Sequence, residues 1–241
     1  KSDLCSDLVN EYPDLQGLLG KYFALSQGFE EDVSNAVSDH YLPLGNNSMT
    51  SKKPISYIVA IADKIDTLVG FFLINEKPTS SKDPFALRRS AIGLLRTIID
   101  NKLNLKLRNL ISYNIKLLEE QGVRKTNENS ENEILNFLKE RMKNILKDKN
   151  IKNDIIEASI SSYFSDNYFD LYKKNTLMNK YINKEAGINA ISSYKRAFNI
   201  VESAKENLSG RPDAVLFRKD EEKHLFEKLN EIRKSFTVNE Q

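Results

Sequence analysis

The sequence predicts an all-α protein, and three observations support this fold class. Nearly every apolar segment repeats at the three- and four-residue spacing of an amphipathic helix. No segment alternates apolar and polar residues over the length of a strand, and nine glycines among 241 residues leave few tight hairpins. The hydrophobic fraction of 40% and the charged fraction of 29% are ordinary for a soluble protein with a buried core.

Two prolines mark expected helix starts in the first half of the chain. Pro54 suits the first turn of one helix, because the N–H that proline lacks has no partner there in any case. The next helix is expected to begin at Asp83 and Pro84, with Asp83 capping free N–H groups and Pro84 in the first helical position. A third helix follows a short polar stretch. The apolar positions of the three are Ile58, Ile61, Ile65, Leu68 and Phe72; Phe85, Ile92, Leu95 and Ile99; and Leu103, Leu107, Leu110, Ile111 and Leu118.

Loops and the second half of the chain complete the predicted organisation. Loops are indicated at 42–47 and 75–81, and a polar run at 121–133 suggests a boundary between domains 1–124 and 125–241. A further break is expected at 209–212. The later helices carry these apolar positions: Ile134, Leu138, Met142 and Ile145; Ile156, Ile160, Tyr163 and Phe164; Ile191, Phe198 and Val201; and Leu225, Leu229, Ile232 and Phe236.

Charge and cysteine content restrict the possible functions. The net charge is only +2, so a nucleic-acid surface must be local and not a basic field over the whole protein. Cys5 is the single cysteine, which excludes an intrachain disulfide and favours a reducing compartment. No apolar run approaches the length of a membrane span. We therefore expect a cytoplasmic protein that is not bound to a membrane.

The helix expected at 83–96 carries an unusual combination of residues. Arg89, Gly93 and Arg96 fall on one face of this helix, so the position between the two arginines has no side chain. Arg88 lies next to this face. A closely packed backbone or a polyanion would make use of such a stripe.

This arginine-rich string resembles a signature of the β subunit of bacterial glycyl-tRNA synthetase, the enzyme of two different subunits. Other stretches resemble the same family in the same order along the chain, which makes the resemblance strong. They are 1–4, 11–17, 22–24, 60–68 and, more weakly, 195–200.

The resemblance implies a function in tRNA recognition. Adenylation and glycine transfer would belong to the α subunit, which would use ATP with Mg²⁺ in an α2β2 assembly. The β subunit would hold tRNA(Gly) through an HD-like helical domain, here 1–124, and a helical anticodon-binding domain of the arginyl-tRNA synthetase type, here 125–241. The chain begins with Lys1 inside a motif, and its last apolar stripe has no helix left to cover it. We therefore expect a fragment with an incomplete C-terminal domain.

The HD resemblance lacks the residues that would bind a metal. Asp3 and Asp63 match the two aspartate positions, but Lys1 stands where a histidine ligand would be wanted. An ammonium has no lone pair to donate to a metal. His40 and His224, the only histidines, are not placed in the paired motif. One interpretation is a metal-dependent phosphohydrolase completed by residues outside this chain. The favoured one is a degenerate site, without metal or catalytic centre, in which Lys1 forms an ion pair with Asp3 or Asp63.

Arginines of the 83–96 helix are the first candidates for tRNA binding. Arg88, Arg89 and Arg96 could contact phosphates, or they could form ion pairs with Asp63 or Asp66 on the adjoining helix. The pairing interpretation is slightly favoured.

Two further groups of residues have open interpretations. Lys195, Arg196 and Asn199 form, with Ser192, a polar stripe that could bind RNA or could be a plain solvated helix face. The aromatic residues near 163–172 could stack on bases, but an aromatic cluster at helical spacing is more often part of a core. They are Tyr163, Tyr168, Phe169 and Tyr172. A helical scaffold that binds only protein stays open as an alternative to tRNA recognition.

Overall fold

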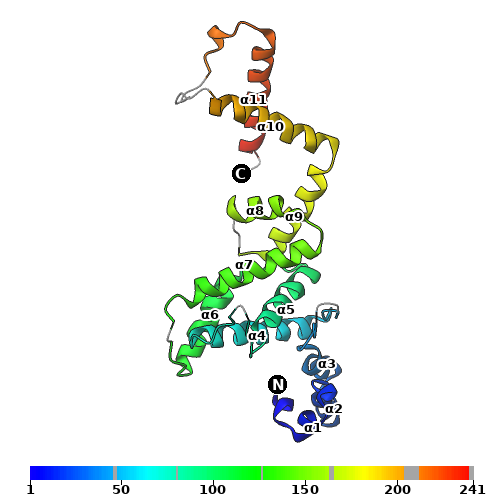
Figure 1. The fold of residues 1–241 in the computed structure, drawn as a ribbon. Helices are drawn as coiled ribbons and strands as arrows, with labels where there is room; N and C mark the ends of the chain where they lie inside the picture. Colours follow the sequence, from blue (N-terminus) through cyan, green and yellow to red (C-terminus); the bar gives the residue numbers. More distant parts are fainter. Residues whose placement is uncertain (46–47, 80, 126, 163–165, 204–211, 239–241) are drawn as a thin grey trace. The chain divides into compact units, whose positions relative to one another are not determined.

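The computed structural model describes residues 1–45, 48–79, 81–125, 127–162, 166–203 and 212–238. Over these residues the secondary structure consists of eleven α-helices and three short 3₁₀ helices, without a strand (Figure 1). The prediction of an all-α fold is confirmed. The chain divides into two compact units, Lys1–Gly187 and Ile188–Gln241, and each is described by itself.

The first unit begins with a lobe of short helices. Ser6 starts the first α-helix by accepting a hydrogen bond from the N–H of Leu8, and Gly17, at φ 77°, precedes α2. Helix α2 packs against α3, and α3 packs against the long helix α4. The elements are η1 (Ser2–Cys5), α1 (Asp7–Glu11), η2 (Pro13–Leu15), α2 (Leu18–Ser26), α3 (Glu31–Asp39) and α4 (Pro54–Leu73).

The main core of this unit lies between the longer helices. Helix α4 packs against α5, α6 and α7, and α5 also packs against α7 and α9 (Figure 1). Apolar side chains at helical spacing fill the space between them, among them Leu68, Leu94, Ile98, Leu138 and Met142, each at most 1% exposed. The remaining helices are α5 (Leu87–Asp100), α6 (Leu107–Glu120), α7 (Ser130–Asp148), α8 (Asn153–Ser162) and α9 (Tyr168–Ile182).

The two predicted proline starts have different outcomes. Pro54 occupies the first turn of α4, as predicted. Helix α5, however, begins at Leu87 and not at Pro84, because Ala86 takes a left-handed conformation with φ 55° immediately before it. Asp83 still caps the helix: its carboxylate accepts hydrogen bonds from the N–H groups of Leu87 (2.8 Å) and Arg88 (3.0 Å). The capping residue was identified correctly, and the first helical residue was not.

Other boundaries were predicted with similar accuracy. Helix α6 begins at Leu107 and not near Leu103, which packs against the core from the preceding segment. The loops predicted at 42–47 and 75–81 lie outside the helices wherever they are described; residues 46, 47 and 80 are outside the described part of the chain.

The polar run at 121–133 does not separate two cores. Helix α7, which follows it, contributes Ile134, Leu138 and Met142 to the same core as α4 and α5, and the first compact unit continues to Gly187. Residues 121–125 and 127–129 of this run lie between α6 and α7, and residues 130–133 form the first turn of α7. The assignment of 1–124 and 125–241 to two domain families stays a prediction.

The second unit contains most of α10 (Glu185–Ser203), the short η3 (Ala214–Leu216) and α11 (Asp220–Val238). The apolar stripes predicted here are not buried: Phe198 is 50% exposed, Val201 55% and Leu225 62%. The ring of Phe217 contacts that of Phe226, with centroids 5.4 Å apart. The predicted break at 209–212 falls mostly on residues outside the described ranges, as do Tyr163, Phe164 and the side chain of Phe236.

None of the helices in the described part of the chain combines the length and apolarity that a bilayer span requires.

Candidate functional site

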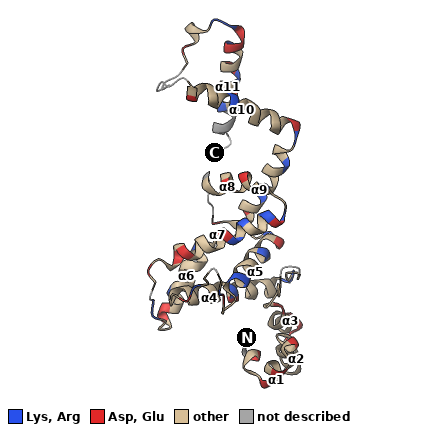
Figure 2. Ribbon diagram, viewed as in Figure 1, with Lys and Arg blue, Asp and Glu red and all other residues tan. Residues whose placement is uncertain are grey.

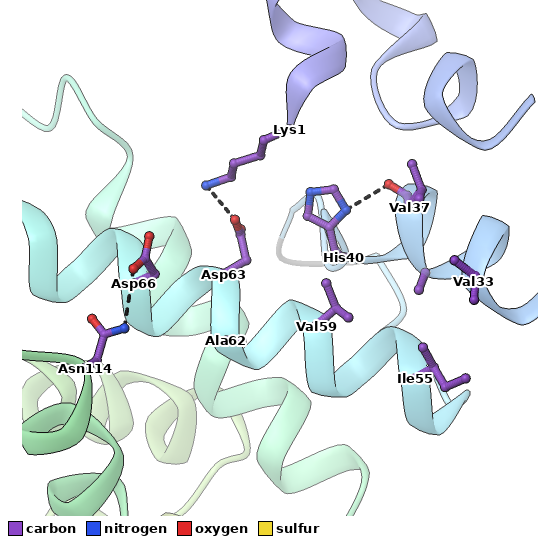
Figure 3. A pocket seen from close by; sticks show the side chains of 11 residues that line it. Lys1, Val33, Val37, His40, Ile55, Val59, Ala62, Asp63, Asp66 and Asn114 are labelled. Atoms are coloured by element: carbon purple, nitrogen blue, oxygen red, sulfur yellow. Dashed lines mark hydrogen bonds and ion pairs between the residues drawn. The ribbon is translucent and has the colours of Figure 1, made fainter. Parts of the chain in front are cut away.

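The two aspartates of the HD resemblance are engaged in different ways, and Asp63 is paired with a lysine. The Lys1 Nζ lies 2.8 Å from Oδ1 of Asp63 (Figure 3). It also donates a hydrogen bond of 3.0 Å to the Thr67 hydroxyl. This is one of the two ion pairs that the sequence predicted for Lys1. A fixed positive charge therefore faces the carboxylate that a metal would need.

Asp3 is held by the lobe around it. Its side chain is 6% exposed and accepts hydrogen bonds of 2.6 Å from the Tyr41 hydroxyl and of 2.6 Å from the N–H of Gly17. Burial would raise the pKa of Asp3, but these two hydrogen bonds hold it below its ordinary value. The carboxylate ties the turn before α2 to Tyr41, which lies just beyond the end of α3, and each of its oxygens accepts one hydrogen bond.

His40 is buried, with 5% of its surface exposed. Its Nδ1–H donates to the carbonyl of Val37 at 2.8 Å, and burial lowers the pKa of the imidazole, which favours the neutral form. His40 lines a cavity of about 590 Å³ with Lys1, Asp63 and Asn114 (Figure 3). No sequence signal indicated this position, because it depends on how α3 packs against α4.

These residues do not form a metal site. Within the described ranges, no three side chains of His, Cys, Asp or Glu gather as metal ligands. Asp63 is neutralised by Lys1, and Asp3 accepts two hydrogen bonds. The donor set therefore does not fit a divalent cation.

Lys64, which the sequence analysis did not single out, is the buried cation of this region. It is 6% exposed, and its Nζ donates a hydrogen bond of 2.9 Å to the carbonyl of His40. Burial lowers the pKa of Lys64 to about 8; the charge of Asp63 acts in the opposite direction, and that of Lys1 adds to the lowering. The side chain passes over Gly93, where an added Cβ would lie 2.9 Å from Lys64 Cε. The close approach predicted at Gly93 is made by the neighbouring helix.

The three arginine candidates of α5 differ in their partners. Arg88 donates to the carbonyl of Thr79, and Arg96 donates to the carbonyls of Gly45 (3.0 Å) and Ser48 (2.6 Å). Arg89 is exposed and makes no hydrogen bond or ion pair with any described residue.

Among the described residues, none of these arginines forms an ion pair with Asp63 or Asp66. Asp63 pairs with Lys1, and Asp66 accepts a hydrogen bond of 3.4 Å from Asn114 (Figure 3). Arg88 and Arg96 instead fix the segments that precede α5 and α4, while Arg89 keeps an open guanidinium.

The candidates on α10 are solvated. Lys195, Arg196 and Asn199 are exposed, and none of the three has a polar partner among the described residues. Tyr194 is 68% exposed, and its ring contacts that of Phe198 with centroids 6.1 Å apart. Basic and acidic residues are interspersed along the helices in Figure 2, in line with the net charge of +2. Any basic surface is therefore local.

The aromatic residues near α9 belong to the core, as predicted. Tyr168 is fully buried, and its hydroxyl donates to the carbonyl of Leu135 at 3.2 Å. Phe169 and Tyr172 pack against the same core. The ring of Tyr168 is therefore not available for base stacking, whereas Phe169 and Tyr172 are only partly buried.

Comparison with known proteins gives the family. A family model described as glycyl-tRNA synthetase beta subunit matches residues 1–161. The glycine–tRNA ligase beta subunit of Rickettsia canadensis is 40% identical over 232 residues, which cover 96% of this chain and 33% of that protein. The subunit of the same name from Ruegeria sp. is 39% identical over 207 residues, covering 86% of this chain and 28% of that protein. The subunit from Dinoroseobacter shibae is 35% identical over 258 residues, which cover 95% of this chain and 36% of that protein.

The chain thus spans about a third of the length of these relatives. A match over more than half of the chain and identities of 35–40% leave no ambiguity. The chain belongs to the glycyl-tRNA synthetase beta subunit family.

Proposed function

We propose that this chain is the tRNA-recognition part of a glycine–tRNA ligase β subunit. It binds and positions tRNA(Gly), while the α subunit of an α2β2 assembly activates glycine with ATP and Mg²⁺ and transfers it. The observation that carries the proposal is the family match, since the relatives over the whole matched length are tRNA ligase subunits.

The absence of a catalytic centre in this chain is part of the same proposal. Both aspartates of the HD resemblance are engaged, Asp3 by two hydrogen bonds and Asp63 by an ion pair with Lys1. This supports a degenerate HD-like site around Asp3 and Asp63. The division of labour leaves binding and orientation to this chain.

The proposed means of binding is local positive charge on helices. Each lysine or arginine that neutralises a phosphate releases condensed counterions, so binding weakens as salt rises. Such contacts fix the orientation of the RNA but carry no base information. Lys195 and Arg196 suit this role because both are exposed and have no acidic partner among the described residues.

The test removes these two charges. We expect Lys195→Ala/Arg196→Ala to weaken the binding of tRNA(Gly) and to reduce the slope of log K against log[salt] by about two units, about one for each lost contact. Fluorescence anisotropy over a range of stated salt concentrations measures both quantities.

A matched control removes the same charge elsewhere. Lys116 and Arg124 are exposed and have no polar partner in the described part of the chain, so Lys116→Ala/Arg124→Ala should preserve affinity and slope. If the two double variants behave alike, α10 does not contact the tRNA. If the unaltered chain binds no RNA, the alternative of a protein-binding scaffold is favoured instead.

A further inference from the structure

A second cavity next to the degenerate HD site gathers positive charge. Its volume is about 370 Å³, and its charged lining residues are Lys1, Lys64 and Arg89 against the single carboxylate of Asp63. It shares Lys1 and Asp63 with the cavity drawn in Figure 3. We call it the cation cleft. Because Asp63 is already paired with Lys1, two positive charges in the cleft have no counter-charge from its lining.

Lys64 supplies the buried charge of the cation cleft. Its ammonium has three N–H donors, and the carbonyl of His40 accepts one of them. Within the described residues no carboxylate lies within ion-pair distance of its Nζ. Burying an ammonium without an anionic partner is costly, which makes the site favourable for an anion.

Arg89 supplies the open side of the cation cleft. Its neighbours on α5, Arg88 and Arg96, donate to backbone carbonyls, whereas Arg89 has no described partner. Ser90 also lines the cleft. A guanidinium fork can bind two oxygens of one phosphate, and an ammonium can bind a third as a point charge.

We propose that the cation cleft binds one phosphate group of an RNA backbone between Lys64 and Arg89. This inference rests on the proposed function for the identity of the RNA, but not for the chemistry of the site. Lys64 and Arg89 lie close to the position where the HD resemblance would place a metal. Their two positive charges favour the binding of a phosphate there.

The first arm of the test uses inorganic phosphate and the whole chain. NMR signals of Lys64 Nζ and Arg89 Nε are followed at pH 6.5, where the lysine is protonated because its pKa is about 8. We expect both signals to shift and saturate in the millimolar range. Arg89→Gln should abolish the shift at Lys64. Arg124→Gln removes an arginine outside the cleft that is also exposed and has no partner among the described residues, and it should preserve the shift.

The second arm measures tRNA(Gly) affinity for the same variants. Arg89→Gln should weaken binding about three- to tenfold and reduce the salt slope by about one unit, and Arg124→Gln should change neither. If the NMR signals of Lys64 and Arg89 do not shift when phosphate is added, the cation cleft is not a phosphate site, even if tRNA binds normally. A phosphate response with equal tRNA affinities for the two variants would overturn RNA as the source of the phosphate. If the unaltered chain binds no tRNA, the proposed function is wrong, and so is the assignment of the phosphate to RNA. The first arm still shows whether the cation cleft binds phosphate.

Discussion

Among single residues, Lys64 has the clearest consequence for stability. Its pKa is lowered from 10.5 to about 8 in the folded chain, chiefly by burial, with Asp63 opposing and Lys1 adding to the effect. Between these two pH values the unfolded chain holds a proton that the folded chain has released. The contribution of Lys64 to the free energy of unfolding therefore rises with pH from about 8 to 10.5 and is least favourable below 8.

Lys64→Met should remove this pH dependence while keeping the aliphatic packing over Gly93. We expect the stability of the variant relative to the unaltered chain to fall by up to about 3 kcal/mol as the pH rises from 7 to 10.5. Urea denaturation at a series of pH values measures the difference. The control Lys116→Met changes an exposed lysine, so its stability relative to the unaltered chain should be the same at every pH. A constant difference for Lys64→Met as well would mean that the buried lysine titrates normally.

The sequence predicted part of this residue-level picture. The pairing of Lys1 with Asp63 followed from chemistry, since an ammonium cannot take the place of a metal ligand but can neutralise a carboxylate. Lys64 was missed because a lysine beside two aspartates looks like part of a solvated helix edge. Its burial depends on Gly93 of α5, 29 positions further along the chain, which no local pattern connects to α4.

At the scale of elements, the junction of α9 and α10 depends on one glycine. A Cβ at Gly187 would collide with the carbonyl oxygen of Tyr181 and lie 2.8 Å from Cα of Ile182. Both neighbours are backbone atoms, so they cannot move without distorting the end of α9. We expect Gly187→Ala to destabilise the chain by about 1–3 kcal/mol, despite the higher helix propensity of alanine.

Gly45→Ala is the matched control for that substitution. Apart from the adjoining residues, no atom of the described chain lies within 4 Å of an added Cβ at Gly45, so the free energy of unfolding should change by less than about 0.5 kcal/mol. Thermal unfolding followed by circular dichroism compares the two variants. An equal melting temperature for Gly187→Ala and the unaltered chain would show that the junction tolerates a side chain.

Helix positions were more predictable than helix boundaries. Apolar spacing located α4, α5, α6 and α7, because each buries one face in a common core. The start of α5 was misplaced by three residues, from Pro84 to Leu87, because Asp83 caps from outside a left-handed turn at Ala86. A side-chain cap that spans such a turn leaves the same sequence signature as an ordinary N-cap.

For the whole molecule, the fold class and family were accessible from the sequence and the division into units was not. Polar composition at 121–133 indicated a domain boundary, but the apolar face of α7 that follows closes the same core as α4 and α5. The exposed Phe198 and Leu225 likewise show that helical spacing of apolar residues predicts an apolar face without predicting what covers it.

We propose above that this chain holds tRNA(Gly) and leaves the chemistry to another subunit. The most direct measurement is the dissociation constant of the unaltered chain for tRNA(Gly) and for an unrelated tRNA, both at about 0.1 M salt, since affinities without a stated salt concentration cannot be compared. The account predicts measurable, salt-sensitive binding that is tighter for tRNA(Gly). Equal affinity for the two RNAs, or no binding to either, would contradict it.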